Sequence, residues 1–252
     1  MASNPQGAST LPLFYNSLAP LSSQLHPNHK IRARAVFPEA HKTHAIPLTV
    51  DEFASAQKFY PIVFGIGDNA APLALLGLSE GVNHFVDAEG RWRQDVYIPA
   101  YVRRYPFMLA KLSEQTEELT LCFDDSSGLV AEGDFEGQAL FDGDQPSEQT
   151  KGILGFCEQF ETAVARTRGF MDELNKLNLI IDGEVTLQQQ GMEQPAVYRG
   201  FRMVSEEQLR ELRGDQVRKM VQNGMLGLIY AHLFSLANVR ELFAQQMLAA
   251  AA

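Results

Sequence analysis

Apolar residues at steps of three and four dominate one stretch of the 252-residue sequence, from Ile153 to Leu177. The series consists of Ile153, Phe156, Cys157, Phe160, Val164, Met171, Leu174 and Leu177. Side chains three and four positions apart share one face of a helix, so the spacing predicts a long amphipathic helix. One face of this helix must be buried, which gives the chain a large helical component.

The rest of the C-terminal half mixes further helices with one strand pair. We expect strands over 179–189 and 196–204, followed by a capping box at 205–208 that begins a short helix. A second apolar series over 217–243 predicts another helix, with a break or kink at Asn223-Gly224.

Short strands, turns and short helices fill the N-terminal half. A capping box formed by Thr49 and Glu52 starts one helix, and a second helix is expected over 98–104. Residues 85–92 predict a hairpin in which Gly90 takes a left-handed turn position. The expected strands are 31–37, 61–64, 72–76, 107–112 and 118–123. The fold class is therefore α+β, with an antiparallel sheet and short helices in the N-terminal half and long amphipathic helices with a strand pair in the C-terminal half.

Residues 1–30 form a Pro-rich stretch with many Ser, Gln and Asn residues, which predicts an irregular arm. Several apolar side chains in this arm indicate that it packs on the body or on a partner. Residues 31–252 are expected to form a single domain. The change of pattern near residue 145 could divide that domain into two interlocked halves.

The charge balance excludes some functions. The chain has 21 Lys and Arg against 31 Asp and Glu, a net charge of −10. Nucleic-acid binding needs a concentrated basic face, and the dense basic spots here are only Arg91/Arg93 and Arg103/Arg104. No apolar stretch reaches the roughly 20 residues of a membrane span, and no secretory signal is evident. These observations predict a soluble cytoplasmic protein.

Cysteines, histidines and glycines give no cofactor or metal motif. Cys122 and Cys157 lie in apolar stretches and are expected to be buried free thiols, with a single disulfide between them as the open alternative. His41 and His44 lack a carboxylate at a ligand spacing, so we expect no metal. The Gly-x-Gly at 65–67 lacks the third glycine and the helix of a dinucleotide site, which favours a turn and no cofactor.

Arginines and tyrosines are most concentrated between residues 97 and 107. Arginine presents a planar fork of donors to carboxylate and phosphate groups and stacks on aromatic rings. The segment therefore predicts an anion or carbohydrate pocket, or a protein-binding hot spot. The structural alternative is that an arginine ties a helix to acidic neighbours while the tyrosines fill the core. Adjacent helical residues point about 100° apart, so at most one arginine should face inward. The candidate residues are Tyr97, Tyr101, Arg103, Arg104 and Tyr105.

Asn83, Asp87, Trp92 and His232 are further candidates for binding a ligand or partner. Trp92 could stack on a sugar ring, although a single tryptophan is more often a core anchor. Asn83 precedes the expected hairpin of 85–92, and Asp87 lies within it. His232 lies on the apolar stripe of the last helix, where a hydrogen-bonded core histidine is the default interpretation and a ligand or proton-relay role is the alternative.

Several segments together resemble the SapC family of bacterial proteins. The most specific is Tyr97-Ile-Pro-Ala-Tyr-Val-Arg-Arg-Tyr-Pro-Phe107. Supporting segments are Tyr60-Pro-Ile-Val-Phe64, Asn83-x-Phe-Val-Asp87, Gly90-x-Trp92 and Ala231-His-Leu-x-Ser-Leu236, and the likeness runs from about residue 30 to residue 243. At His84 the family often has a more apolar residue, which argues against a shared role for this side chain.

The resemblance implies a role near transport. The family is named after a gene cluster for surface-layer (S-layer) protein export, and members are often labelled transporter permeases. Similar proteins accompany TonB-dependent outer-membrane receptors, cupin-like proteins and halogenase-like proteins. The permease label conflicts with a sequence that has no candidate membrane span. No catalytic residues can be transferred from the family.

These observations lead to three hypotheses about function. The first is a soluble cytoplasmic accessory protein that binds a partner protein or a small polar or anionic ligand through residues 97–107. The second is an enzyme of unrecognised type acting on a peptide, amino acid or sugar, with His232, His84, Tyr101 and Asp87 as the first residues to test. The third is a structural homo-oligomer that uses the apolar stripe of 217–243 as its interface.

Overall fold

The computed structural model describes residues 11–67, 70–113, 118–188 and 194–251. The chain divides into two compact units, and each unit is built from two separate stretches of sequence. The first unit comprises Met1–Arg34 with Arg104–Glu158, and the second comprises Ala35–Arg103 with Gln159–Ala252. The chain therefore passes between the units after residues 34, 103 and 158.

The first unit consists of short antiparallel strands and one 3-10 turn. Strands β1, β7 and β6 form one sheet in that order, β8, β2 and β9 form a second, and β10 pairs with β11. The Pro-rich arm contributes β1, so part of it is integrated into a sheet. The elements are β1 (Ala19–Pro20), β2 (Lys30–Ile31), β6 (Phe107–Lys111), β7 (Leu119–Phe123), η3 (Asp125–Ser127), β8 (Val130–Ala131), β9 (Gln138–Ala139), β10 (Phe141–Asp142) and β11 (Gln145–Pro146).

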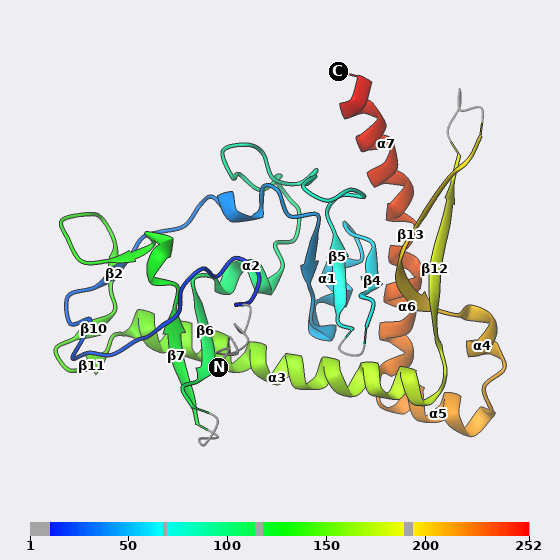
Figure 1. The fold of residues 1–252 in the computed structure, drawn as a ribbon. Coiled ribbons are helices and arrows are strands. Elements are labelled where there is room, and N and C mark those ends of the chain that lie inside the picture. Colours follow the sequence, from blue (N-terminus) through cyan, green and yellow to red (C-terminus); the bar gives the residue numbers. More distant parts are fainter. Residues whose placement is uncertain (1–10, 68–69, 114–117, 189–193, 252) are drawn as a thin grey trace, which may run out of the picture. The chain divides into compact units, whose positions relative to one another are not determined.

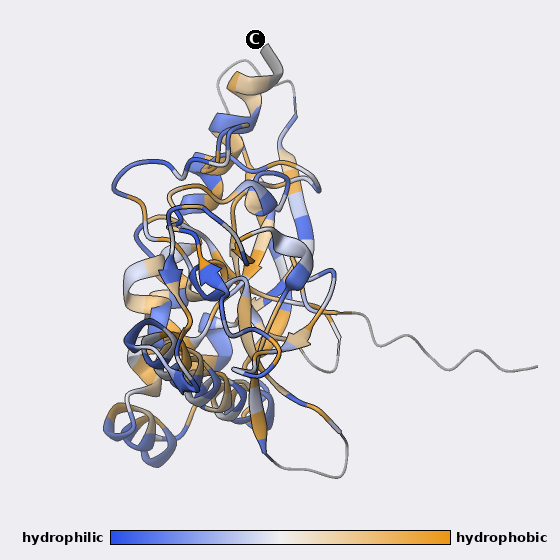
Figure 2. Ribbon diagram, turned by 90° about the vertical axis from the view of Figure 1, so that its left-hand side faces the viewer, coloured by the Kyte–Doolittle hydropathy of each residue, from blue (hydrophilic) through white to orange (hydrophobic). Residues whose placement is uncertain are grey.

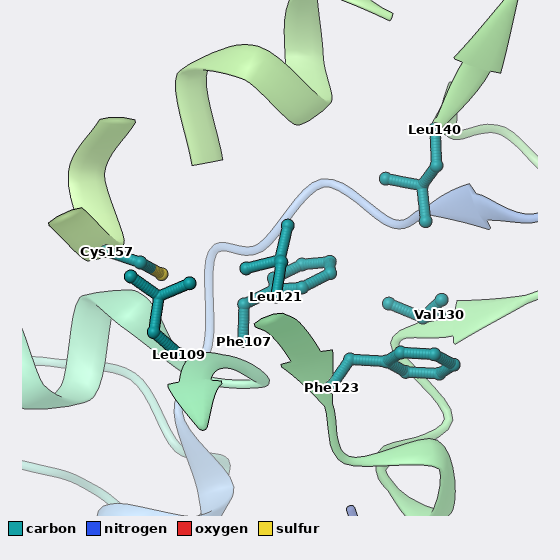
Figure 3. Close-up of a cluster of buried hydrophobic side chains, with 7 residues drawn as sticks. All are labelled: Phe107, Leu109, Leu121, Phe123, Val130, Leu140 and Cys157. Carbon is teal, nitrogen blue, oxygen red and sulfur yellow. The ribbon is translucent and has the colours of Figure 1, made fainter. Parts of the chain in front are cut away.

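Alternate side chains of β6 and β7 form the core of the first unit (Figure 3). Residue pairing across the two strands places Phe107 opposite Phe123 and Leu109 opposite Leu121. Because side chains alternate between the faces of a strand, these four lie on one side of the sheet. Val130, Leu140 and Cys157 complete the cluster. Cys122 and Cys157 are both buried free thiols, as the sequence predicted.

The second unit is built on a five-stranded antiparallel sheet with the strand order β12-β13-β4-β5-β3. Figure 1 shows α6 and α7 beside the long β12–β13 hairpin of this unit. Its elements are η1 (Pro38–Ala40), β3 (Ala45–Pro47), η2 (Val50–Glu52), α1 (Phe53–Ala56), β4 (Ile62–Phe64), β5 (Pro72–Leu75), β12 (Ile180–Leu187), β13 (Ala196–Val204), α4 (Glu206–Arg210), α5 (Gly214–Gln222), α6 (Met225–Ser235) and α7 (Asn238–Ala251).

Two helices include residues of both units. They are α2 (Ala100–Arg104) and α3 (Glu148–Lys176). The long amphipathic helix predicted from the apolar series is thus confirmed as α3. Figure 2 shows hydrophobic and hydrophilic residues on both helices and strands, and several connecting loops are hydrophilic.

The α+β class is confirmed, and most predicted elements are present. The break at Asn223-Gly224 occurs between α5 and α6, where Gly224 has a φ of 79°. A second break separates α6 from α7. No helix among the described residues is long and apolar enough to cross a membrane.

Two expected elements, the strand over 31–37 and the hairpin over 85–92, are shorter in the structure than predicted. Instead of a strand over 31–37, only Lys30–Ile31 pairs in a sheet. The chain passes from the first unit to the second after Arg34, so no single sheet can pair along this stretch. The hairpin of 85–92 is reduced to one bridge between Val86 and Trp92.

Candidate functional site

A buried carboxylate, Glu52, organises the polar residues of the second unit. It ends η2, where its Oε2 accepts hydrogen bonds from the backbone N–H and the hydroxyl of Thr49, both at 2.9 Å. Its Oε1 accepts from the backbone N–H of Ala100 at 2.7 Å and from the hydroxyl of Tyr97 at 3.1 Å. A capping box is therefore extended into a junction that holds the start of α2 against η2.

A chain of hydrogen bonds extends from Tyr97 to Trp92. The Trp92 indole N–H donates to the Tyr60 hydroxyl at 3.1 Å, and that hydroxyl donates to the backbone carbonyl of Tyr97 at 2.5 Å. Burial raises the pKa of Tyr60 well above its usual value, against a lowering influence of the Trp92 hydrogen bond and of the positive charge of Arg93. Burial and the charge of Glu52 raise the pKa of Tyr97 to about 12. Both tyrosines are therefore neutral hydrogen-bonding groups near neutral pH.

Two exposed arginines lie beside this network. The Arg103 guanidinium lies over the ring of Tyr97, 5.6 Å from its centroid, and donates to the Tyr97 hydroxyl at 3.2 Å. The Arg93 guanidinium lies over the ring of Phe85 at 5.4 Å. We call Trp92, Arg93, Tyr97 and Arg103 the arginine–aromatic surface; Trp92 and Tyr97 are half-buried and both arginines are exposed.

Arg91 and Arg93 differ although they are neighbours in one loop. Arg91 lies 3.6 Å from a carboxylate oxygen of Asp87 and 3.8 Å from one of Glu89. In the part of the chain that the structure describes, no carboxylate lies within salt-bridge distance of Arg93. Arg93 is consequently a cation held on an aromatic ring and available to an external anion.

Two other candidate residues of the 97–107 segment, Tyr101 and Arg104, are buried. Tyr101 is 6% exposed and its ring meets Phe160 edge to face. Arg104 is 7% exposed, and its guanidinium lies 5.8 Å from the centroid of the Tyr15 ring. Arg103 and Arg104 thus face outward and inward respectively, as the angle between adjacent helical residues predicted. Tyr101 and Arg104 are therefore buried side chains, whereas Tyr97 and Arg103 are the members of this candidate set that reach the surface.

Tyr105 belongs to a second polar network, in the first unit. Its hydroxyl donates to Asp124 at 3.1 Å, and Asp124 also accepts from the backbone N–H groups of Asn16 and Ser126 and from the Ser126 hydroxyl. Burial raises the pKa of Asp124, but these hydrogen bonds outweigh it, and the pKa lies below its usual value. Burial and the charge of Asp124 raise the pKa of Tyr105 to about 12. Arg34 donates to the Tyr105 carbonyl at 2.8 Å.

Asn83 and Asp87 stabilise loops. The Asn83 amide donates to the Ala40 carbonyl and its oxygen accepts from the backbone N–H of Phe85, both at 2.8 Å. Asp87 is exposed and accepts from the backbone N–H groups of Glu89 and Arg91, which is an Asx-turn geometry. Trp92 also meets Phe37 edge to face at 5.9 Å, consistent with a core anchor.

His232 has the geometry of a core histidine. Its side chain is fully buried, its Nε2 accepts from the backbone N–H of Val204 at 3.0 Å, and its Nδ1 lies 2.8 Å from the carbonyl of Ile62. Its ring stacks on Phe64 at 4.6 Å. Burial lowers the pKa of His232 to about 4. Both ring nitrogens are engaged by backbone groups, so we leave His232 out of the proposed binding surface.

The residues singled out for the enzyme hypothesis include Asp87 and His84. Asp87 is engaged in a turn, and the half-buried His84 has a buried Nε2 without a hydrogen-bond partner among the described residues. Burial lowers the pKa of His84. Among the residues that the structure describes, no three His, Cys, Asp or Glu side chains are grouped to hold a metal ion.

Sequence reasoning missed the centre of the arrangement. The sequence indicates Glu52 only as a capping residue and Tyr60 only as part of a family-like segment. Arg93 belongs to a basic spot in the sequence but is not among the candidate site residues. The capping-box spacing of Thr49 and Glu52 was the available signal for a carboxylate at this position, whereas nothing in the sequence indicated that Tyr97 and Ala100 would bond to it.

Comparison with known proteins gives one match. A family model described as SapC matches residues 21–242 of the chain. No curated protein matches it, and no solved structure does. The matched residues include the arginine–aromatic surface and the Glu52 junction and cover most of the chain. The chain therefore belongs to the SapC family.

Proposed function

We propose that this SapC family member is an accessory binding protein that takes up an anionic group at the arginine–aromatic surface. The observation that carries the proposal is the exposed Arg93 guanidinium, which lies over Phe85 without a carboxylate partner among the described residues. The anionic group is a carboxylate, carried by an acidic segment of a partner protein or by a small polar ligand. The setting that the family resemblance implies is a bacterial uptake or surface-export system.

The surroundings of the two arginines suit such a binding site. The exposed Arg93 lies over the ring of Phe85, and this contact reduces the side-chain conformations that it loses on binding. Tyr97 is fixed by its hydrogen bond to the buried Glu52, and it in turn accepts a hydrogen bond from Arg103. Because the positions of these groups are set before a ligand arrives, the entropic cost of binding is reduced.

The charge distribution supports a local interaction. The chain as a whole has a net charge of −10, so an anion is repelled at long range and attracted only close to the arginines. At physiological ionic strength the repulsion is screened beyond about 8 Å. We therefore expect affinity to pass through a maximum as salt rises, because added salt first removes the overall repulsion and then the local attraction.

The test uses a fluorescent hexaglutamate peptide as the probe of an acidic segment and free glutamate as the probe of a small ligand. Peptide binding is measured by anisotropy and glutamate binding by NMR chemical shifts. Arg93→Ala should weaken peptide binding by roughly three- to tenfold, the effect of losing a charge-assisted hydrogen bond at an exposed site. A response to the peptide alone would assign the site to a partner protein, and a response to glutamate would assign it to a small ligand.

Arg91→Ala is the matched control, because Arg91 is exposed in the same loop but already paired with Asp87 and Glu89. We expect this variant to bind the peptide as the unmodified protein does. A neutral hexaglutamine peptide should not bind either protein. Equal losses in the Arg91 and Arg93 variants, or no binding of either acidic probe, would refute the proposal.

A further inference from the structure

Helix α6 exposes an aromatic pair on the surface of the second unit. Tyr230 is 41% exposed and Phe234 is 69% exposed, and their rings stack with centroids 5.6 Å apart. The helix, Met225–Ser235, contains no Asp, Glu, Lys or Arg. An exposed, uncharged aromatic face on a surface helix is typical of an interaction site.

The exposed residues of this face form a regular stripe. Gly227, Tyr230, Phe234 and Ala237 are all exposed, and they follow one another at steps of three, four and three. Residues at these steps lie on one side of a helix, as in the contact seam of a helix pair. Ala237 lies at the junction between α6 and α7, just beyond the end of α6. The stripe therefore runs from Gly227 along α6 and ends at Ala237 in the turn before α7.

The stripe is symmetric about its centre, with a small residue at each end and two aromatic residues between them. If a second copy of the stripe is placed antiparallel, Gly227 faces Ala237 of the other copy and Tyr230 faces its Phe234. A two-fold interface requires this kind of self-complementary surface, because each pair of contacts occurs twice.

We propose that the protein forms a homodimer in which two α6 helices pack antiparallel through Gly227, Tyr230, Phe234 and Ala237. The small residues let the two backbones approach at the ends of the interface, and the aromatic residues fill its middle. This inference is independent of the anion-binding role, because no residue of the arginine–aromatic surface takes part in it.

Electrostatics favours the antiparallel arrangement. The N-terminus of a helix is partly positive and its C-terminus partly negative, so antiparallel helices bring opposite charges together. Two copies of a chain with a net charge of −10 repel each other, and an uncharged face is where they can meet without like charges in contact. The absence of charge along α6 thus matches a second copy as its occupant.

The first test is the mass in solution at tens of micromolar protein, measured by light scattering after size exclusion and by sedimentation velocity. We expect twice the chain mass of 28.0 kDa. Phe234→Glu should raise the dissociation constant of the dimer by at least about tenfold, because it places two like charges in the middle of the interface. Since the side chain is exposed, the variant should keep the circular dichroism spectrum of the unmodified protein.

Ile66→Glu is the matched control, because Ile66 is 71% exposed, close to the value for Phe234, but lies in the loop after β4. This variant should remain dimeric. A monomeric unmodified protein, or a dimer that survives Phe234→Glu, would overturn the proposal. So would a dimer disrupted equally by Ile66→Glu.

The second test fixes the arrangement by disulfide cross-linking. A Cβ at position 227 has open space around it, and the native thiols are buried. Under oxidation, an equimolar mixture of Gly227→Cys and Ala237→Cys proteins should cross-link, whereas neither variant alone should. In the antiparallel pair, like positions at the stripe's ends lie about 15 Å apart along the axis. Cross-linking of either variant when it is oxidised alone would refute the antiparallel geometry. Phe234→Glu should bind hexaglutamate as the unmodified protein does, which separates this proposal from the anion-binding one.

Discussion

Residues 97–107 and helix α6 contrast in which of their side chains the structure buries and which it exposes. The 97–107 segment is rich in arginine and tyrosine, yet Tyr101, Arg104 and Tyr105 are buried. The apolar stripe of 217–243 is compatible in the sequence with either a core helix or a subunit interface, and in the structure α6 exposes Tyr230 and Phe234. The first segment therefore buries much of its polar chemistry, whereas the second exposes two aromatic rings.

The contrast teaches why residue type alone is a poor guide to a binding site. Buried carboxylates need donors, because an unsatisfied charge in the interior is costly. Tyr97 serves Glu52, and Tyr105 serves Asp124. Much of the apparent functional chemistry of the 97–107 segment is therefore the internal hydrogen bonding of two polar networks. What remains for a ligand is the exposed edge of the first network.

The largest expected effect tests the structural side of this comparison. Glu52→Ala removes the acceptor for two backbone N–H groups and two hydroxyl groups, which remain buried. We expect the free energy of unfolding to fall by about 3–5 kcal/mol, measured by urea denaturation. Asp51→Ala is the control, because the Asp51 carboxylate is next to Glu52 in sequence but is exposed and paired with Arg166 on the surface. This variant should lose less than about 1 kcal/mol of unfolding free energy. Similar losses in both variants would show that Glu52 does not hold the junction together.

The next effect concerns pH and His232 in the core. The pKa of His232 is lowered to about 4 in the folded protein, whereas it is about 6.5 in an unfolded chain. The unfolded state therefore binds the proton more readily. The contribution of the neutral ring to stability is fully present above pH 6.5 and is lost as the pH falls toward 4, by about 3 kcal/mol.

Urea denaturation at a series of pH values measures this loss. His232→Gln should be less stable at neutral pH, and its stability should fall less steeply between pH 6.5 and 4. NMR titration of the imidazole gives the pKa directly. A variant with the same slope as the unmodified protein would show that another group causes the acid sensitivity.

A smaller effect is expected for the network of the first unit. Tyr105→Phe removes one hydrogen bond to the buried Asp124 while leaving the ring in place, and should cost about 1 kcal/mol of unfolding free energy. Tyr198→Phe is the matched control, because the half-buried Tyr198 makes a ring stack with Phe201 and no hydrogen bond of its hydroxyl is among the described contacts. If Tyr198→Phe costs as much, the hydrogen bond to Asp124 contributes nothing specific.

The smallest effect separates a turn residue from a ligand-binding one. Asp87→Ala removes the acceptor of the Asx turn at Glu89 and Arg91 and should cost about 0.5–1 kcal/mol. Asp87→Asn keeps an acceptor oxygen and should retain most of that stability. Thermal melts measure both, and neither variant should lose hexaglutamate binding. A loss of binding in Asp87→Asn at full stability would return Asp87 to the binding site.

Local patterns in the sequence predicted most of the fold. The three- and four-residue spacing of apolar side chains identified α3, and the turn at Asn223-Gly224 separated α5 from α6. The strand over 31–37 failed because its residues divide between two units, which no local pattern reports. Pairings such as Tyr97 with Glu52 depend on residues 45 positions apart, and exposure of Phe234 depends on which side of α6 the rest of the unit covers. Neither is encoded in a short window of sequence.

The most direct test compares Arg103→Ala with Arg104→Ala, two neighbours in α2 of which the first is exposed and the second is buried. Hexaglutamate affinity and unfolding free energy are measured for both. We predict that Arg103→Ala lowers hexaglutamate affinity by roughly three- to tenfold and lowers the unfolding free energy by less than about 1 kcal/mol. Arg104→Ala should lower the unfolding free energy by about 2–4 kcal/mol, while its folded fraction binds the peptide normally. Loss of binding by folded Arg104→Ala protein, with normal binding by Arg103→Ala, would contradict the account.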